Sequence, residues 1–474
     1  MRLSARALLL CVCTLVSSPA WPASGYWTGA GNPSWTNDAN WSVSPAPFGT
    51  NAATFNGAGN ARTTIDLDGL ACIRTILFDT AAAASYTLGT GGPNAQTLVL
   101  TNSALVQSTS TAWNDQTIDA AVQLGTDVGA GFYAFRTDNP LRSLTVSGDI
   151  APPASGGTAG TKVLSLTGAG NIVLSGSLSK GGSSVFSVTN ALTGRLTLTG
   201  SNTVTTFYMT GSSNTIVDIA GGELYLNNLG SITLYSTQGG IINGPGKIRI
   251  STNTGSNYGD NYIASGKTLV INAPITGVGG FEMWSGSGTF VFNGANDFLQ
   301  NVIIGTAGTI SISKIGNAGS TTSNLGQGTN ITFNTSGGRL LYTGEGESSD
   351  RILNIKGSAV VEHAGTGHLN FATNVTVSSG AKTLTLRVSS SGTAEFSGLL
   401  RNDLGNLFVT KDGSGTWTLS AANTYNGNTA VSAGTLRLAG PKGAIGSSTN
   451  ITVRANATLP LDNTTSTSNT NRLR

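Results

Sequence analysis

The sequence predicts an all-β protein: a right-handed parallel β-helix, or β-solenoid, of irregular coils with an N-terminal cap region. Short runs alternate apolar and polar side chains, as in "RLTLTG" (195–200) and "KTLTLRV" (382–388), which is the pattern of half-buried strands. Gly, Asn and Ser separate the runs and supply corners, and 65 of the 474 residues are Gly. Segments of the chain also resemble one another, which is typical of repeat architectures.

The first 20 residues predict a signal peptide. Two arginines precede an apolar segment at 7–16, and small residues precede a cleavage position after Ala20. The apolar segment is too short to cross a bilayer. We therefore expect export by a Sec-type pathway, and an extracellular or cell-surface location associated with the outer membrane.

Composition excludes several classes of protein. Only 10% of the residues are charged and the formal net charge is +3 at pH 7, which provides no basic surface for nucleic acid. Beyond the predicted signal peptide only Cys72 remains, so the mature chain has no internal disulfide. It also lacks a run of apolar residues long enough for a membrane-spanning helix.

Residues 21–95 are predicted to form a Trp-rich capping region. Trp27, Trp35 and Trp41 lie close together in the sequence, and large rings can cover the open end of a first coil. The alternative is a carbohydrate-binding module that presents these three rings, exposed and coplanar, to sugars.

Residues 96–460 are predicted to form the solenoid, with degenerate repeats near 194–219, 288–312 and 415–438. Without gaps, "GTWTLSAANT" (415–424) aligns on "GTFVFNGAND" (288–297) and "GRLTLTGSNT" (194–203). Each copy has Asn at its ninth position, namely Asn202, Asn296 and Asn423. We expect these residues at equivalent corners, where stacked amides bond one another.

An antiparallel alternative rests on "YNGN" (425–428), because Asn-Gly is the usual turn of a β-hairpin. Hairpins would build a sandwich rather than a helix. The remaining residues, 461–474, are expected to form a polar tail that is disordered or marks a truncation point.

The stretch "KDGSGTWTLSAANTYNGNTAVSAGTLRLAG" (411–440) resembles the autotransporter-associated β-strand repeat, with Trp417 where the family has Leu. The motif residues are Gly415, Trp417, Leu419, Asn423, Tyr425, Gly427, Gly434, Leu436 and Leu438. The opening segment 26–57 is similar to the start of large secreted proteins that carry this repeat. The resemblance implies a passenger-type solenoid displayed at, or released from, a bacterial surface. The polar C-terminal residues depart from the family's terminal outer-membrane barrel, so no barrel is expected here.

Few residues suggest chemistry. Tyr258, Asp260 and Tyr262, in "SNYGDNY", form a polar and aromatic segment suited to sugar contact. The segment "GEGESSDR" (344–351) concentrates carboxylates that an enzyme could use as an acid pair. His363 and His368 are expected in a solvated loop, and neither a metal nor another cofactor is expected.

The sequence therefore predicts a secreted or surface-displayed, structural or adhesive β-solenoid without catalytic activity. Its expected partners are polysaccharides or glycans of host and cell surfaces, not nucleic acid. Two alternatives are a β-helix polysaccharide lyase or hydrolase, and a carbohydrate-binding module that uses the N-terminal tryptophans.

Overall fold

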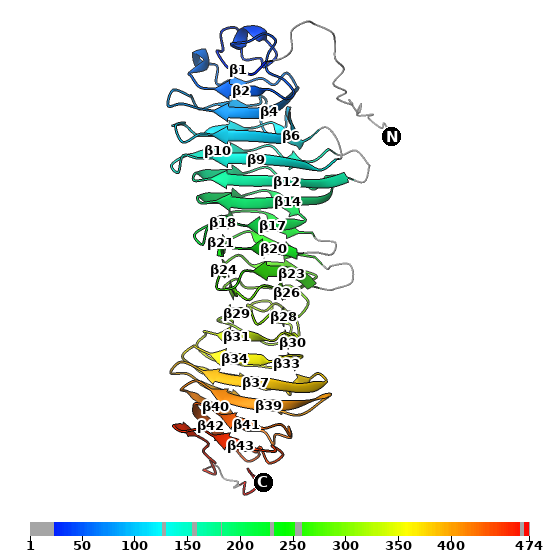
Figure 1. Cartoon of the computed structure of the whole chain (residues 1–474), viewed down its shortest axis with the longest axis vertical. Helices are drawn as coiled ribbons and strands as arrows, with labels where there is room; N and C mark the ends of the chain where they lie inside the picture. The colour runs from blue at the N-terminus through cyan, green and yellow to red at the C-terminus, as the bar shows by residue number, and fades with distance from the viewer. Residues whose placement is uncertain are drawn as a thin grey trace. The chain divides into compact units, whose positions relative to one another are not determined.

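A computed structural model describes residues 23–125, 129–153, 159–181, 183–227, 232–251, 258–464 and 469–473. The predicted signal peptide lies outside these residues. The chain divides into two compact units, residues 1–186 (unit 1) and 187–474 (unit 2). Within each unit, strands of successive coils lie one above the next (Figure 1).

The strands of unit 1 form two parallel sheets. One contains β1 (Gly25–Tyr26), β2 (Ala52–Phe55), β4 (Leu70–Phe78), β6 (Thr97–Ser108), β8 (Ala121–Leu124), β9 (Gly131–Thr137), β11 (Ile150–Ala151) and β12 (Ala159–Gly168). The other contains β3 (Thr64–Ile65), β5 (Thr87–Leu88), β7 (Gln116–Ile118), β10 (Ser143–Val146) and β13 (Asn171–Leu174). Two 3₁₀ turns, η1 (Asp38–Asn40) and η2 (Gly59–Ala61), are the helical elements of the described chain. The boundary between the units falls within β14 (Ser183–Leu192).

Unit 2 has four parallel sheets. Sheet I contains β17 (Thr206–Met209), β20 (Ile232–Ser236), β23 (Tyr258–Ile263), β26 (Gly280–Ser285), β28 (Val302–Ile304), β30 (Asn330–Phe333), β33 (Ile352–Ile355) and β36 (Thr376–Val377). Sheet II contains β15 (Arg195–Leu198), β18 (Ile216–Ile219), β21 (Gly240–Asn243), β24 (Thr268–Ile271), β27 (Thr289–Phe292), β29 (Thr309–Ile312), β31 (Gly338–Tyr342), β34 (Ala359–His363), β37 (Gly380–Val388), β39 (Gly405–Asp412), β41 (Thr429–Val431) and β43 (Ile451–Val453).

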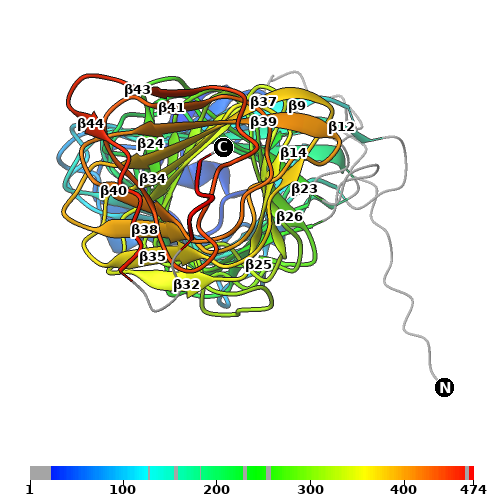
Figure 2. The same ribbon diagram turned by 90° about the horizontal axis from the view of Figure 1, so that it is seen from below.

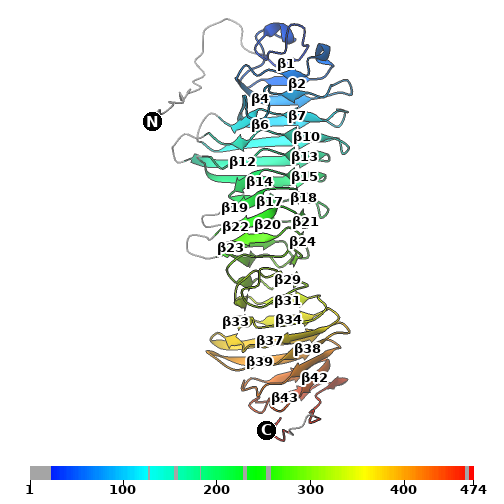
Figure 3. The same cartoon turned by 180° about the vertical axis from the view of Figure 1, so that it is seen from behind.

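Sheets I and II form two sides of each coil in unit 2. The third side is divided between two shorter sheets, III and IV. Sheet III contains β16 (Ser201–Val204), β19 (Glu223–Leu226), β22 (Lys247–Ile250) and β25 (Ile275–Gly277). Sheet IV contains β32 (Glu347–Ser349), β35 (His368–Phe371), β38 (Thr393–Phe396), β40 (Thr416–Leu419), β42 (Gly434–Leu438) and β44 (Ala457–Thr458). In Figure 2, β34, β35 and β26 lie on three different sides of the interior, and Figure 3 shows β18, β21 and β24 stacked in sheet II.

The predicted parallel β-solenoid is confirmed, and the antiparallel alternative is wrong. Residues 425–428 join β40 to β41, but these two strands pair with strands of neighbouring coils and not with each other. The Asn-Gly dipeptide is therefore part of a coil corner and not a hairpin turn. The predicted boundaries at residues 95 and 460 stay predictions; parallel pairing is present from β1 and β2 onward.

The interior of unit 2 consists of columns in which equivalent side chains of successive coils stack. One column of sheet II runs through Val217, Ile242, Ile271, Phe292, Ile312, Tyr342, His363 and Val388, all buried. The expectation of a solvated loop is wrong for His363, whose side chain lies inside this column. The Gly367 carbonyl lies 2.8 Å from its Nε2, so the imidazole has a hydrogen-bond partner inside the core.

The Asn shared by the three internal copies has a structural role, but in Asn423 its amide bonds backbone groups and not the amide of another Asn. Asn423 is buried, and its Nδ2 donates to the carbonyls of Ala421, at 2.9 Å, and of Ala444 in the next coil, at 3.0 Å. Its Oδ1 accepts from the Leu400 amide of the preceding coil at 2.9 Å. The side chain thus bonds backbone on three levels, because corner carbonyls point inward where no strand can pair with them.

Amide-to-amide stacking occurs elsewhere. Asn272 donates to Asn243, and Asn293 donates to Asn272, each at 2.8 Å. The expectation of equivalent corners is also wrong. The strands β15 and β27 lie in sheet II, whereas β40 lies in sheet IV, and Asn202 lies within β16 instead of at a corner. The same sequence pattern therefore serves more than one face of the coil.

Candidate functional site

The three N-terminal tryptophans are buried in unit 1, with 2% of Trp27, 2% of Trp35 and 5% of Trp41 exposed. The Trp41 ring packs edge-on against both others, with centroids 5.2 Å from Trp27 and 4.9 Å from Trp35. Each indole N–H donates to a backbone carbonyl at 3.0 Å or less. Rings so enclosed cannot stack on a sugar, so the carbohydrate-binding alternative, which required exposed rings, is wrong for these residues.

The motif residues of 411–440 lie in the last coils of unit 2 and are mostly interior. Trp417, Leu419, Tyr425, Leu436 and Leu438 are fully buried. Tyr425 shares a 2.8 Å hydrogen bond with Thr429. A Cβ at Gly415 would lie 2.4 Å from Val388 and one at Gly427 would lie 2.2 Å from the Leu407 carbonyl, and Gly434 has φ +64°. These residues build the stack, and the buried indole N–H of Trp417 has no hydrogen-bond partner among the described residues.

Tyr258, Asp260 and Tyr262 lie together on the outer face of β23, in sheet I. Tyr262 continues a column of phenol rings that the sequence analysis did not identify. Tyr208, Tyr235 and Tyr262, here the tyrosine column, are in register on β17, β20 and β23. Their ring centroids are 5.3 Å and 4.2 Å apart, and the last two rings are nearly parallel, at 11°.

Trp284 extends this face on the next strand. It is the additional residue of a bulge, since Asn261 and Tyr262 pair with Met283 and Ser285. A bulge redirects the side chain of its extra residue, and 56% of Trp284 is exposed. No ring of the described residues stacks on the indole, so a broad apolar surface is open to solvent.

Two carboxylates lie beside these rings. Asp260 pairs in register with Glu282 on β26, so both project from the outer face of sheet I on adjacent coils. Only 6% of Glu282 is exposed, and Asn334 donates to its Oε1 at 3.4 Å. Burial, and then the charge of Asp260, raise the pKa of Glu282 to about 7, although Lys356 opposes this shift. Burial also raises the pKa of Asp260.

Two carboxylates of "GEGESSDR", Glu347 and Asp350, anchor an insertion instead of forming a free acid pair. The two oxygens of Glu347 accept the amides of Ile315 and Gly316 at 2.6 and 2.8 Å. Asp350 accepts the Ala318 amide at 2.7 Å. Arg351, 1% exposed, donates to Ser323 and to the carbonyls of Ile315, Gly316, Asn317, Gly326 and Gly328. Residues 313–328 are thereby fixed to the following coil.

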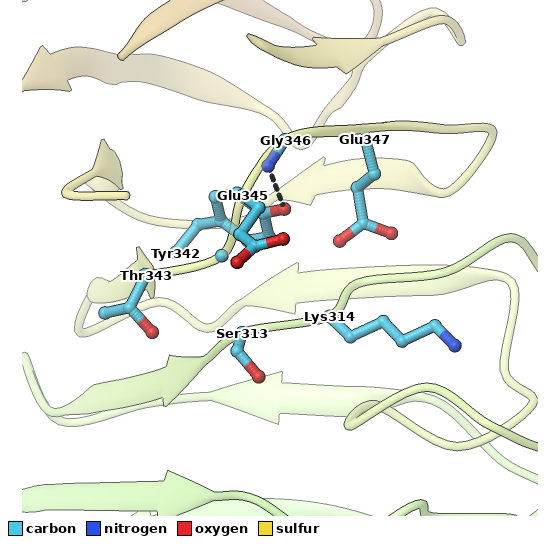
Figure 4. A pocket seen from close by; sticks show the side chains of 8 residues that line it. Ser313, Lys314, Tyr342, Thr343, Glu345, Gly346 and Glu347 are labelled. Atoms are coloured by element: carbon cyan, nitrogen blue, oxygen red, sulfur yellow. Dashed lines mark hydrogen bonds between the residues drawn. The ribbon is translucent and has the colours of Figure 1, made fainter. Parts of the chain in front are cut away.

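An open hollow of about 550 Å³ lies beside this insertion (Figure 4). Ser313 and Lys314 form one side, and the corner from Tyr342 to Glu347 forms the other. In Figure 4 the carboxylate of Glu347 points towards the segment after β29 that carries Ser313 and Lys314.

Within the described part of the chain, no three His, Cys, Asp or Glu side chains gather as a metal site would require. The same residues contain no helix with the length and hydropathy needed to cross a membrane.

Comparison with known proteins confirms the resemblance seen in the sequence. Residues 409–438 match the family described as passenger-associated-transport-repeat. The chain is also similar to a protein of Brucella suis biovar 1 (strain 1330) named "Adhesin BmaC autotransporter", with 29% identity over 351 residues. The aligned region covers 69% of this chain and 9% of that protein, so the chain spans a small part of its relative. No solved structure matches it significantly.

Proposed function

We propose that this chain is part of a surface-displayed adhesive protein whose outer face on sheet I binds glycans. Similarity to an autotransporter adhesin and the passenger repeat at 409–438 support an adhesive role and an extracellular or surface location. The observation that carries the glycan proposal is the tyrosine column with the exposed Trp284 beside it.

The chemistry of this face fits a sugar chain. Tyr and Trp provide large contact areas at low conformational cost, because each has only two side-chain torsions. The Tyr235 and Tyr262 rings cover one another, so they offer edges and hydroxyls, whereas the indole of Trp284 offers an open face. Asp260, which is half-buried, supplies oxygens that accept hydrogen bonds from sugar hydroxyls. Successive coils repeat such contacts along the face, so weak contacts can add up.

The experiment compares binding of the full chain and its Trp284→Ala variant to neutral glucans, mannans and galactans. We expect at least one of these polysaccharides to retain the chain. Trp284→Ala should lower the affinity about tenfold, which corresponds to a loss of about 1.4 kcal/mol in binding free energy. Trp113→Ala is the matched control, because Trp113 is 53% exposed and lies in unit 1. Equal affinities of the Trp284 variant and the unaltered chain would contradict the proposed site.

A further inference from the structure

The hollow beside residues 313–328 arises from an interruption of the third side of unit 2. Sheet III ends at β25 and sheet IV begins at β32, so no strand of either sheet lies between them. The insertion occupies part of this interval, and the hollow remains where the corner from Tyr342 to Glu347 passes Ser313 and Lys314 (Figure 4). Its walls are held in place, because Arg351, Glu347 and Asp350 fix the insertion.

Two opposite charges on the hollow are available to a ligand. Glu347 already accepts two backbone amides, but Glu345 and Lys314 are exposed, and neither forms an ion pair with a described residue. The Lys314 Nζ donates one hydrogen bond, to Thr322 at 3.2 Å. An ammonium group has three donors, so two remain for a ligand.

Hydroxyls complete the lining. Ser313 donates to Asn324 Oδ1 at 3.3 Å, and Thr343 donates to the Ile312 carbonyl at 3.1 Å. Both oxygens keep lone pairs that can accept from a ligand hydroxyl. The hollow thus combines one cation, hydroxyl acceptors and two carboxylates, of which Glu347 is already engaged by backbone amides. Its volume lies in the range of small-molecule sites.

We propose that this hollow binds an acidic sugar residue, with Lys314 at the sugar carboxylate and Glu345, Ser313 and Thr343 at its hydroxyls. Binding depends on a charge-assisted hydrogen bond from Lys314. It is separate from the tyrosine column, since it uses other residues and provides a lysine for the sugar carboxylate.

The test measures binding of glucuronate to the full chain by calorimetry, with glucuronate methyl ester as the uncharged probe. We expect a dissociation constant on the order of 1 mM for glucuronate, as for a small exposed site, and at least tenfold weaker binding of the ester. Lys314→Gln should weaken glucuronate binding at least tenfold. Lys247→Gln, an exposed lysine on β22, is the matched control and should change nothing.

Three results would overturn this inference: no binding of glucuronate at concentrations on the order of 10 mM, equal binding of acid and ester, or unchanged binding by the Lys314 variant. Melting temperatures of all variants show whether each is folded. Trp284→Ala separates the two sites, because it should weaken retention by neutral polysaccharides and leave glucuronate binding intact. Failure of one proposal is therefore distinguishable from failure of the other.

Discussion

Asn423 shows how one side chain holds three coils together. Its amide bonds Leu400 in the coil before, Ala421 in its own coil and Ala444 in the coil after. Asn296 repeats part of this arrangement: it accepts the Ile275 amide at 2.7 Å and donates to the Asn324 carbonyl at 2.7 Å. Such residues satisfy the backbone at corners, where a parallel stack has no ladder.

Replacing Asn423 by Ala should therefore destabilise unit 2. The change leaves buried backbone groups without a partner, which costs about 1–3 kcal/mol. Asn428→Ala is the matched control, since Asn428 is exposed and should change stability by less than about 0.5 kcal/mol. Urea unfolding of both variants measures the difference, and equal midpoints would refute the role given to Asn423.

Trp417 occupies a position that is normally Leu in the repeat family, and its neighbours in the stack show why the larger ring fits. In register with it are Ala394 on β38 and Leu436 on β42. The small Ala394 offsets the volume of the indole in the shared column, as close packing requires. This compensation could not be predicted, because the sequence does not reveal which residues of different coils face each other.

At the scale of strands, β23 and β26 place Asp260 and Glu282 side by side on sheet I. Glu282 has a pKa of about 7 in the folded chain, above its ordinary value of 4.5. A carboxyl with a raised folded pKa adds stability below its unfolded pKa and loses it as pH rises through the folded value. Stability should therefore fall between about pH 5 and pH 7.5.

Glu282→Gln should weaken the dependence of folding stability on pH, because the amide of Gln does not titrate. Asp260, whose pKa is also raised, would leave a smaller slope of the same sign. Melting temperatures at pH 5 and pH 7.5 test this, with Glu223→Gln, a half-buried glutamate on β19, as control. Stability of the unaltered chain that rises over this interval would contradict the environment described for Glu282.

The strands themselves were largely predictable, because alternation and corner residues mark them locally. The candidate site was predictable only where it is local: Tyr258, Asp260 and Tyr262 are neighbours in sequence, but Tyr208, Tyr235, Trp284 and Glu282 come from other coils. One signal was available, since Tyr208, Tyr235 and Tyr262 recur at intervals of 27 residues. The hydrogen bonds from Arg351 to the insertion at 313–328 were not predictable, because their acceptors lie 23 to 36 residues away in the sequence.

At the scale of the molecule, each unit is a parallel stack. Its apolar residues lie in the interior, and Asn and Gly lie at the corners between strands. The three N-terminal tryptophans belong to that interior. What distinguishes one outer face from another is therefore a small set of exposed aromatic and charged groups. This arrangement suits adhesion, since a regular stack presents many sites without requiring a deep cavity.

A glycan-binding outer face is best tested by exposing the full chain to an array of bacterial and plant polysaccharides and scoring both retention and cleavage. We expect retention that Trp284→Ala weakens, with no shortening of any polysaccharide. Release of shorter products would contradict this expectation and favour an enzyme with Asp260 and Glu282 as its acids. Absence of retention on every polysaccharide would contradict the glycan-binding face.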